Sequence, residues 1–136
     1  MQKGPRALAV LSDPLNRETI FRSLVACGIE PVLCSTLREA QASLSSGPAD
    51  VVFCESSLSD GSFEDLLSAL ASGEPSPPVI VCARFYQPAL YLDLMDRGAF
   101  DFIEYPYHTE EMRWILVTAF QRDSNPAPMV MTAAGA

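Results

Sequence analysis

The feature that most constrains this chain is a run of four apolar residues, Val51-Val52-Phe53-Cys54, that ends on a single carboxylate, Glu55. An apolar run without alternation is typical of a strand that is covered on both faces, and such strands occur in parallel sheets with helices on each side. In open parallel sheets, functional residues gather beyond the C-terminal ends of the strands. Glu55 therefore stands where a functional residue is expected.

Four other strand-like runs alternate with amphipathic segments along the chain. The strands are predicted at residues 7–11, 31–34, 51–54, 79–83 and 100–104, and the last helix at about residues 109–122. Alternating strands and helices joined by right-handed crossovers predict a three-layer α/β/α sandwich around a five-stranded parallel sheet. The first, third and fourth strands are the most continuously apolar, so we place them at the centre of the sheet.

The length and composition predict one folded domain. The chain has 136 residues, of which 49% are hydrophobic and 19% charged, as in globular rather than disordered proteins. We expect a flexible N-terminus at residues 1–5, a domain at residues 6–122 and a disordered tail at residues 123–136, where prolines prevent a helix from continuing. We expect the domain to stand alone, with no output domain attached.

Charge and hydropathy exclude several classes of function. The net charge of −8 and the scattered basic residues argue against nucleic-acid binding, which needs a basic surface. No apolar run approaches the roughly 20 residues needed to cross a bilayer, so we expect a cytoplasmic protein that does not bind membranes. The four cysteines lack CxxC spacing and the chain has one histidine, so we expect no metal centre.

Three segments, in this order, resemble the receiver domain of two-component response regulators: residues 13–17, residues 55–61, and residues 97–103 leading to Pro106. The resemblance covers about residues 6–122 and implies a flavodoxin-like topology with strand order 2-1-3-4-5. It also implies a phosphate switch. In the family, an Asp ending the third strand takes a phosphoryl group from a histidine kinase. Two acidic residues hold Mg²⁺ beside it, and a Ser or Thr and a Lys bind the phosphoryl oxygens.

This chain departs from the family pattern at every one of those positions. The acceptor position carries Glu55, which is one methylene longer than Asp. The other departures are Leu11 and Ser12 at the acidic pair (with Asp13 nearby), Ala83 at the Ser/Thr position, Tyr105 at the Lys position and Phe102 at the switch aromatic. Because phosphoryl transfer to a carboxylate needs a metal and fixed donors, we expect no Mg²⁺, no other cofactor and no enzymatic activity.

Alternatives remain for the individual residues. Glu55 is either a permanent mimic of a phosphorylated Asp or an acidic residue that faces solvent. Asp13 is either the N-cap of the first helix or a metal ligand. By resemblance, the peptide bond before Pro106 is cis, and we expect Tyr105 to cover the strand ends. The rival functions are a working phosphoacceptor that uses Glu55 or Asp13 with Mg²⁺, and a small-ligand sensor in the vacated cleft.

The last two helices predict a docking surface. In the helix near residues 88–97, Leu92, Met95 and Ala99 fit an inward face, which leaves Tyr91 and Leu94 outside it. In the final helix, Trp114 and Val117 lie outside the inward stripe. Receivers resemble one another in using this surface for partners and dimers. We therefore expect a degenerate receiver that signals by protein–protein docking, with a histidine kinase, an effector or a second copy as its partner.

Overall fold

The structure is a computed structural model that describes residues 5–71, 76–83 and 88–121. Residues 1–4 and 122–136, on which most of the predicted flexible N-terminus and all of the predicted tail fall, lie outside the described residues. The elements in chain order are β1 (Arg6–Val10), α1 (Pro14–Ala26), β2 (Glu30–Cys34), α2 (Leu37–Ser46), β3 (Val51–Cys54), β4 (Ser57–Leu58), β5 (Gly61–Ser62), α3 (Phe63–Ala71), β6 (Val79–Ala83), α4 (Pro88–Asp96), β7 (Asp101–Glu104) and α5 (Thr109–Gln121).

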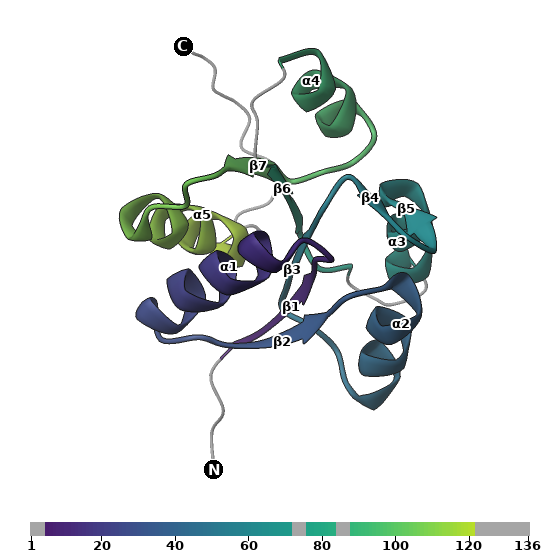
Figure 1. The fold of residues 1–136 in the computed structure, drawn as a ribbon, viewed down its shortest axis with the longest axis horizontal. Helices are drawn as coiled ribbons and strands as arrows, with labels where there is room; N and C mark the ends of the chain where they lie inside the picture. Colours follow the sequence, from purple (N-terminus) through teal and green to yellow (C-terminus); the bar gives the residue numbers. More distant parts are fainter. Residues whose placement is uncertain (1–4, 72–75, 84–87, 122–136) are drawn as a thin grey trace.

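The main sheet has five parallel strands in the order β2-β1-β3-β6-β7 (Figure 1). Counted along the chain within this sheet, the order is 2-1-3-4-5, so the predicted flavodoxin-like topology is confirmed. The three central strands are the ones whose apolar runs predicted burial on both faces. Pro31 lies on the edge strand β2, where a residue without an N–H is tolerated.

Two cores lie on opposite faces of the sheet, because successive strand side chains point to opposite sides. Ala7, Ala9, Val51 and Phe53 belong to the core that α1 and α5 cover. Leu8, Val10, Val52 and Cys54 belong to the core that α2, α3 and α4 cover. Figure 1 shows α1 and α5 together on one side of the sheet, with α2 and α3 on the other. The predicted three-layer sandwich is therefore present.

The first helix begins and ends as its sequence predicts. Asp13 is the N-cap, its side chain accepts a hydrogen bond from the Asn16 N–H at 3.0 Å, and Pro14 occupies the first helical turn. After the helix, Gly28 has a φ of +84°, which is a left-handed conformation that favours glycine. These two ends place the N-terminus of α1 at the C-terminal edge of the sheet, beside the end of β3.

A short antiparallel hairpin, β4–β5, follows β3 and was not predicted. Its two-residue turn is Ser59-Asp60, between the paired residues Leu58 and Gly61. The Asp60 carboxylate accepts hydrogen bonds from the N–H groups of Leu37 and Arg38 at 2.8 and 3.0 Å, in the first turn of α2. The hairpin is thereby attached to the start of α2, and these two N–H groups hold the pKa of the Asp60 carboxyl below its ordinary value.

Three of the four cysteines lie in the core, and the helices are short. Cys34, Cys54 and Cys82 are buried, and all four thiols are free. The longest helices, α1 and α5, have 13 residues each, against the roughly 20 that span a bilayer. Within the described ranges, no helix combines the length and the hydropathy of a membrane span.

Candidate functional site

The candidate site lies at the C-terminal edge of the sheet, where β1, β3 and β6 end. Glu55 follows the last residue of β3, and its backbone N–H donates to the carbonyl of Val10 at 3.3 Å, which continues the β1–β3 pairing. The parallel arrangement brings the segment that follows β1, residues 11–13, beside this carboxylate. Glu55 and residues 11–13 therefore lie together at this edge of the sheet.

From the residues that the structure describes, the Glu55 carboxylate accepts four hydrogen bonds, which come from the segment that follows β1 and from α1. One oxygen, Oε1, accepts from the N–H and the hydroxyl of Ser12 at 3.1 and 2.9 Å. The other, Oε2, accepts from the Asp13 N–H at 3.0 Å and from Asn16 Nδ2 at 3.2 Å. The carboxylate is therefore turned toward the N-terminus of α1, where the helix dipole favours a negative charge. Glu55 is therefore not a carboxylate that faces solvent alone, and its role as a phosphate mimic stays a prediction.

The positions of the family's acidic pair carry Leu11 and Ser12 in this chain. Leu11 is fully buried in the α1/α5 core, and the side chain and N–H of Ser12 donate to Glu55. Asp13 caps α1 through its Oδ2 atom. Among the residues that the structure describes, no group of three or more His, Cys, Asp or Glu side chains could hold a metal ion.

Two residues that the sequence analysis did not single out complete the site. Asn16 is only 3% exposed, and its Oδ1 accepts a hydrogen bond of 2.6 Å from the hydroxyl of Tyr107. The Tyr107 hydroxyl also lies 3.4 Å from the carbonyl oxygen of Ala83, at the end of β6. A chain of hydrogen bonds therefore runs from Glu55 through Asn16 to Tyr107. The available signal was the spacing of Asn16 from Ile20, which places both on the inward face of α1.

The remaining family positions lie around this chain. Ala83 packs against the α2/α3/α4 core and has no hydroxyl, and Phe102 is buried in the same core. Tyr105 packs against the α1/α5 core, and its ring meets the ring of Tyr107 edge to face, with centroids 5.7 Å apart and planes at 81°. We expected Tyr105 to cover the strand ends. Instead, the tyrosine whose hydroxyl contacts the site is Tyr107. The Tyr105–Pro106 peptide bond is cis, as predicted.

The thiol beside the carboxylate is not a substitute nucleophile. Burial raises the pKa of Cys54 to about 12, and the neighbouring Glu55 charge adds to that effect. A thiol is a good nucleophile only as the thiolate. At neutral pH Cys54 is therefore a neutral core residue.

The predicted docking surface is partly wrong. Leu94 is 4% exposed and packs in the α2/α3/α4 core, while Leu92, which we assigned to the inward face, is 66% exposed. The reason is that α4 is apolar on nearly all sides, so the spacing of its leucines does not fix which one faces the sheet. Trp114 and Val117 on α5 are 67% and 41% exposed, as predicted. The side chain of Tyr91 lies outside the part that the structure describes.

The comparisons with known proteins agree with this geometry. No family model matches the chain. A curated relative is the response regulator protein PilR of Pseudomonas aeruginosa, which is 26% identical over 116 residues. The match covers 85% of this chain, and the chain spans only 26% of the length of PilR.

Solved structures of receiver domains superimpose on nearly the whole described fold. A two-component response regulator from Clostridium difficile gives a TM-score of 0.73 at 23% identity, with 90% of this chain and 99% of that chain covered. A response regulator receiver domain protein from Clostridium thermocellum gives 0.75 at 19% identity, covering 88% and 97%. The beryllofluoride-activated NtrC4 receiver domain dimer gives 0.75 at 22% identity, covering 86% and 97%. The chain therefore has the fold of a response regulator receiver domain.

Proposed function

We propose that this domain is a signalling module of the two-component type that works without phosphorylation at the end of β3. It acts by docking another protein on the surface formed by α4, β7 and α5. The partner is a histidine kinase, an effector or a second copy of the chain. The proposed setting is the cytoplasm, where such partners reside.

One observation carries the proposal, and it is the hydrogen bonding of Glu55. Among the described residues, the four donors to its carboxylate belong to Ser12, Asp13 and Asn16, so the oxygens that a metal or a phosphoryl group would meet already accept hydrogen bonds from the chain. To attack a phosphoryl donor, Glu55 would have to leave these donors, which would then lack an acceptor. Hydrogen bonds to a charged group contribute about 1.5–3 kcal/mol each, so this rearrangement is expensive.

The family positions that carry groups which stabilise phosphoryl transfer are also changed in this chain. The positions that carry a hydroxyl and an ammonium in the family carry Ala83 and Tyr105. Removing one preorganised donor commonly costs about 3 kcal/mol of transition-state stabilisation, and here more than one is missing. These losses support a domain that does not catalyse its own phosphorylation.

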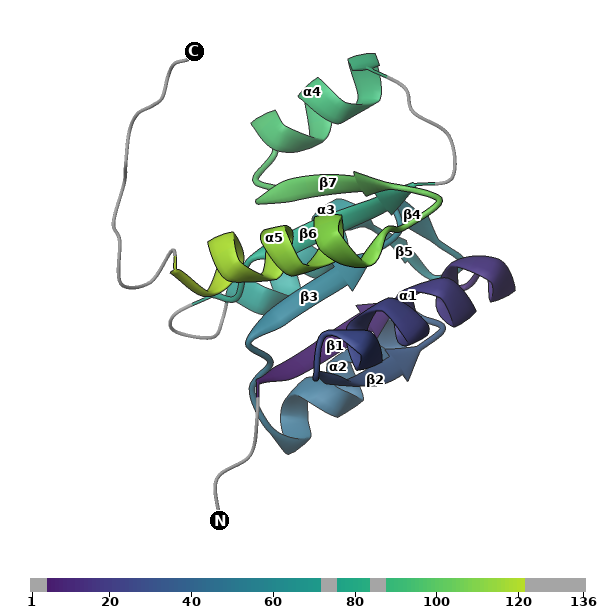
Figure 2. The same ribbon diagram turned by 90° about the vertical axis from the view of Figure 1, so that its left-hand side faces the viewer.

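The docking surface is supported by exposed apolar side chains on two helices that flank the edge strand β7. Leu92 on α4, with Trp114 and Val117 on α5, are among the few large hydrophobic residues that are more than a third exposed. Figure 2 shows α4 and α5 on either side of β7. Tryptophan is a common anchor of protein interfaces, and exposed apolar residues near an unpaired strand edge favour association.

Intact-mass spectrometry after incubation with acetyl phosphate and Mg²⁺ tests the first half of the proposal. We expect no added phosphoryl group, while a receiver domain with an Asp acceptor, treated alongside, gains one. A phosphoryl adduct mapped to Glu55 or Asp13 would instead establish the working phosphoacceptor.

Site-specific photocrosslinking tests the second half. A photoreactive residue at position 114 is expected to form a defined adduct with one protein or with a second copy, and the same residue at the exposed position 41 of α2 is expected to form none. Equal adducts at both positions, or an adduct at position 41 alone, would contradict docking on α5. Sedimentation of the unmodified chain and of the Trp114→Ala variant then distinguishes self-association from binding to a different protein.

A further inference from the structure

Asn16 and Tyr107 form a buried polar connection between two segments that are far apart in the sequence. Asn16 lies in the first turn of α1, and Tyr107 lies in the connection from β7 to α5, two residues before α5 begins. Asn16 is 3% exposed and Tyr107 is 8% exposed, so water does not replace their hydrogen bonds readily. The Tyr107 hydroxyl donates to Asn16 Oδ1 at 2.6 Å, and Asn16 Nδ2 donates to Glu55 at 3.2 Å.

Further contacts join the same two segments. The buried hydroxyl of Ser23, further along α1, donates to the carbonyl of Tyr107 at 3.4 Å. The Cys27 thiol lies 3.9 Å from the carbonyl of Thr109, the first residue of α5. Residues 107–109 therefore contact α1 and its C-cap at three places, and of these three the contact of the Tyr107 hydroxyl continues to the end of β3.

We infer that Asn16 and Tyr107 couple the hydrogen bonding of Glu55 to the position of the first turn of α5. Asn16 uses both ends of its amide, one for Glu55 and the other for Tyr107. A movement of Tyr107 away from α1 leaves Asn16 Oδ1 buried without its donor, and a movement of Glu55 leaves Asn16 Nδ2 without its acceptor. A buried polar group that loses its partner carries a desolvation cost, so the three side chains keep or lose their arrangement together.

This connection deepens the proposed function, on which its consequence for docking rests. Trp114 and Val117 follow the coupled first turn on the same helix α5. A protein that binds α5 in one position therefore also favours one arrangement at Glu55. By thermodynamic linkage, a change at Glu55 alters the affinity of α5 for that protein by the same factor. Asn16 and Tyr107 act here as positioning residues.

Hydrogen-exchange mass spectrometry of two variants tests the coupling in both directions. Tyr107→Phe removes only the hydroxyl and is expected to speed amide exchange by about tenfold in residues 11–16, since loss of a buried hydrogen bond costs on the order of 1–3 kcal/mol and 1.4 kcal/mol is a factor of ten. Glu55→Gln keeps the side-chain shape and is expected to speed exchange in residues 105–112. Thr118→Val is the matched control, because its hydroxyl bonds only to carbonyls within α5.

The distribution of the changes decides the outcome. Faster exchange in the distant segment in both variants, with residues 11–16 unchanged in Thr118→Val, supports the coupling. An effect confined to the substituted segment overturns it. If Tyr107→Phe unfolds the whole domain, the Glu55→Gln variant alone decides, read by the NMR shift of the indole N–H of Trp114, the only tryptophan in the chain. A shift supports the coupling, and an unchanged resonance overturns it.

The acetyl phosphate experiment separates this inference from the proposed function. A phosphoryl adduct together with coupled exchange rejects the proposed function and retains the coupling. An unmodified mass together with uncoupled exchange retains the proposed function and rejects the coupling.

Discussion

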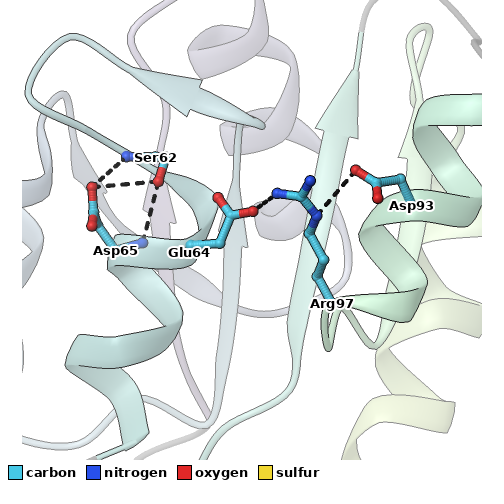
Figure 3. A network of polar contacts seen from close by, with 5 residues as sticks. All are labelled: Ser62, Glu64, Asp65, Asp93 and Arg97. Carbon is cyan, nitrogen blue, oxygen red and sulfur yellow. Dashed lines mark hydrogen bonds and ion pairs between the residues drawn. The ribbon is translucent and has the colours of Figure 1, made fainter.

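Arg97, one residue beyond α4, forms an ion pair with Glu64 in the first turn of α3 (Figure 3). Its Nε atom also lies 3.1 Å from a carboxylate oxygen of Asp93, one turn earlier on α4. On the other helix, the Ser62 hydroxyl accepts from the Asp65 N–H at 3.4 Å, and the Asp65 carboxylate accepts from the Ser62 N–H at 3.0 Å, which is a reciprocal cap. The charged network therefore joins the end of α4 to a capped start of α3.

The first prediction concerns this ion pair. Because both side chains are about half exposed, water and salt screen their attraction. A double-mutant cycle with Arg97→Ala and Glu64→Ala is expected to give a coupling free energy of about 0.2–1 kcal/mol in urea unfolding. The coupling should fall when the measurement is repeated in high salt, and a coupling that salt leaves unchanged would show that the pair acts by something other than charge.

The second prediction concerns the length of the Glu55 side chain. Glu55→Asp restores the residue type that receivers carry at this position, yet the shorter side chain cannot reach both Ser12 and Asn16. We expect a loss of about 2 kcal/mol in the free energy of unfolding, because hydrogen bonds to a charged group contribute about 1.5–3 kcal/mol. Glu104→Asp, at the end of β7, is the matched control and should change stability by less than about 0.5 kcal/mol. Equal effects in the two variants would refute the importance of the Glu55 contacts.

The third prediction separates two leucines of α4. Leu94→Ala removes a side chain from the α2/α3/α4 core and should cost about 2–5 kcal/mol of stability. Leu92→Ala removes an exposed side chain and should stay within about 0.5 kcal/mol of the parent. Chemical denaturation of both variants checks the assignment, and the reverse order would mean that α4 is rotated relative to this structure.

The fourth prediction concerns pH and the β4–β5 hairpin. The N–H groups of Leu37 and Arg38 lower the folded-state pKa of Asp60 below its unfolded value. A carboxyl with a lowered folded pKa stabilises the fold above the unfolded pKa, and this stabilisation is lost as pH falls through the folded pKa. Asp60→Asn should therefore have a lower melting temperature Tm than the parent at pH 7, and the difference should shrink in acid. Asp96→Asn, an exposed change on α4, is the control and should keep the parent's Tm at both pH values.

The sequence predicted the order of the sheet because a strand that is buried on both faces has an uninterrupted apolar run. The runs at residues 51–54 and 79–83 contain no polar residue, and both proved to be central strands. By contrast, α4 has apolar residues around most of its circumference, so its inward face could not be read from spacing. The hairpin was missed because strands of two residues show no periodicity.

The site was predicted in its location but not in its contacts. The strand pattern placed Glu55 and residues 11–13 at one edge of the sheet. Asn16 and Tyr107 were missed because a polar residue near a helix start and an aromatic residue after a proline are both common in solvent-facing positions. Only the three-dimensional packing of α1 against the β7–α5 connection shows that these two side chains meet. Two polar partners that are 91 residues apart produce no local pattern in the sequence.

The four donors around Glu55 have a consequence for how such a protein could be regulated. A carboxylate whose hydrogen-bond donors are part of the polypeptide has its partners as soon as the chain folds, and under the proposed function its state would not vary with the supply of magnesium or of phosphoryl donors. Under the proposed function, the strength of the signal would then follow the number of copies synthesised and degraded. Synthesis and degradation of the protein would then control the signal, as reversible phosphorylation does in an ordinary relay.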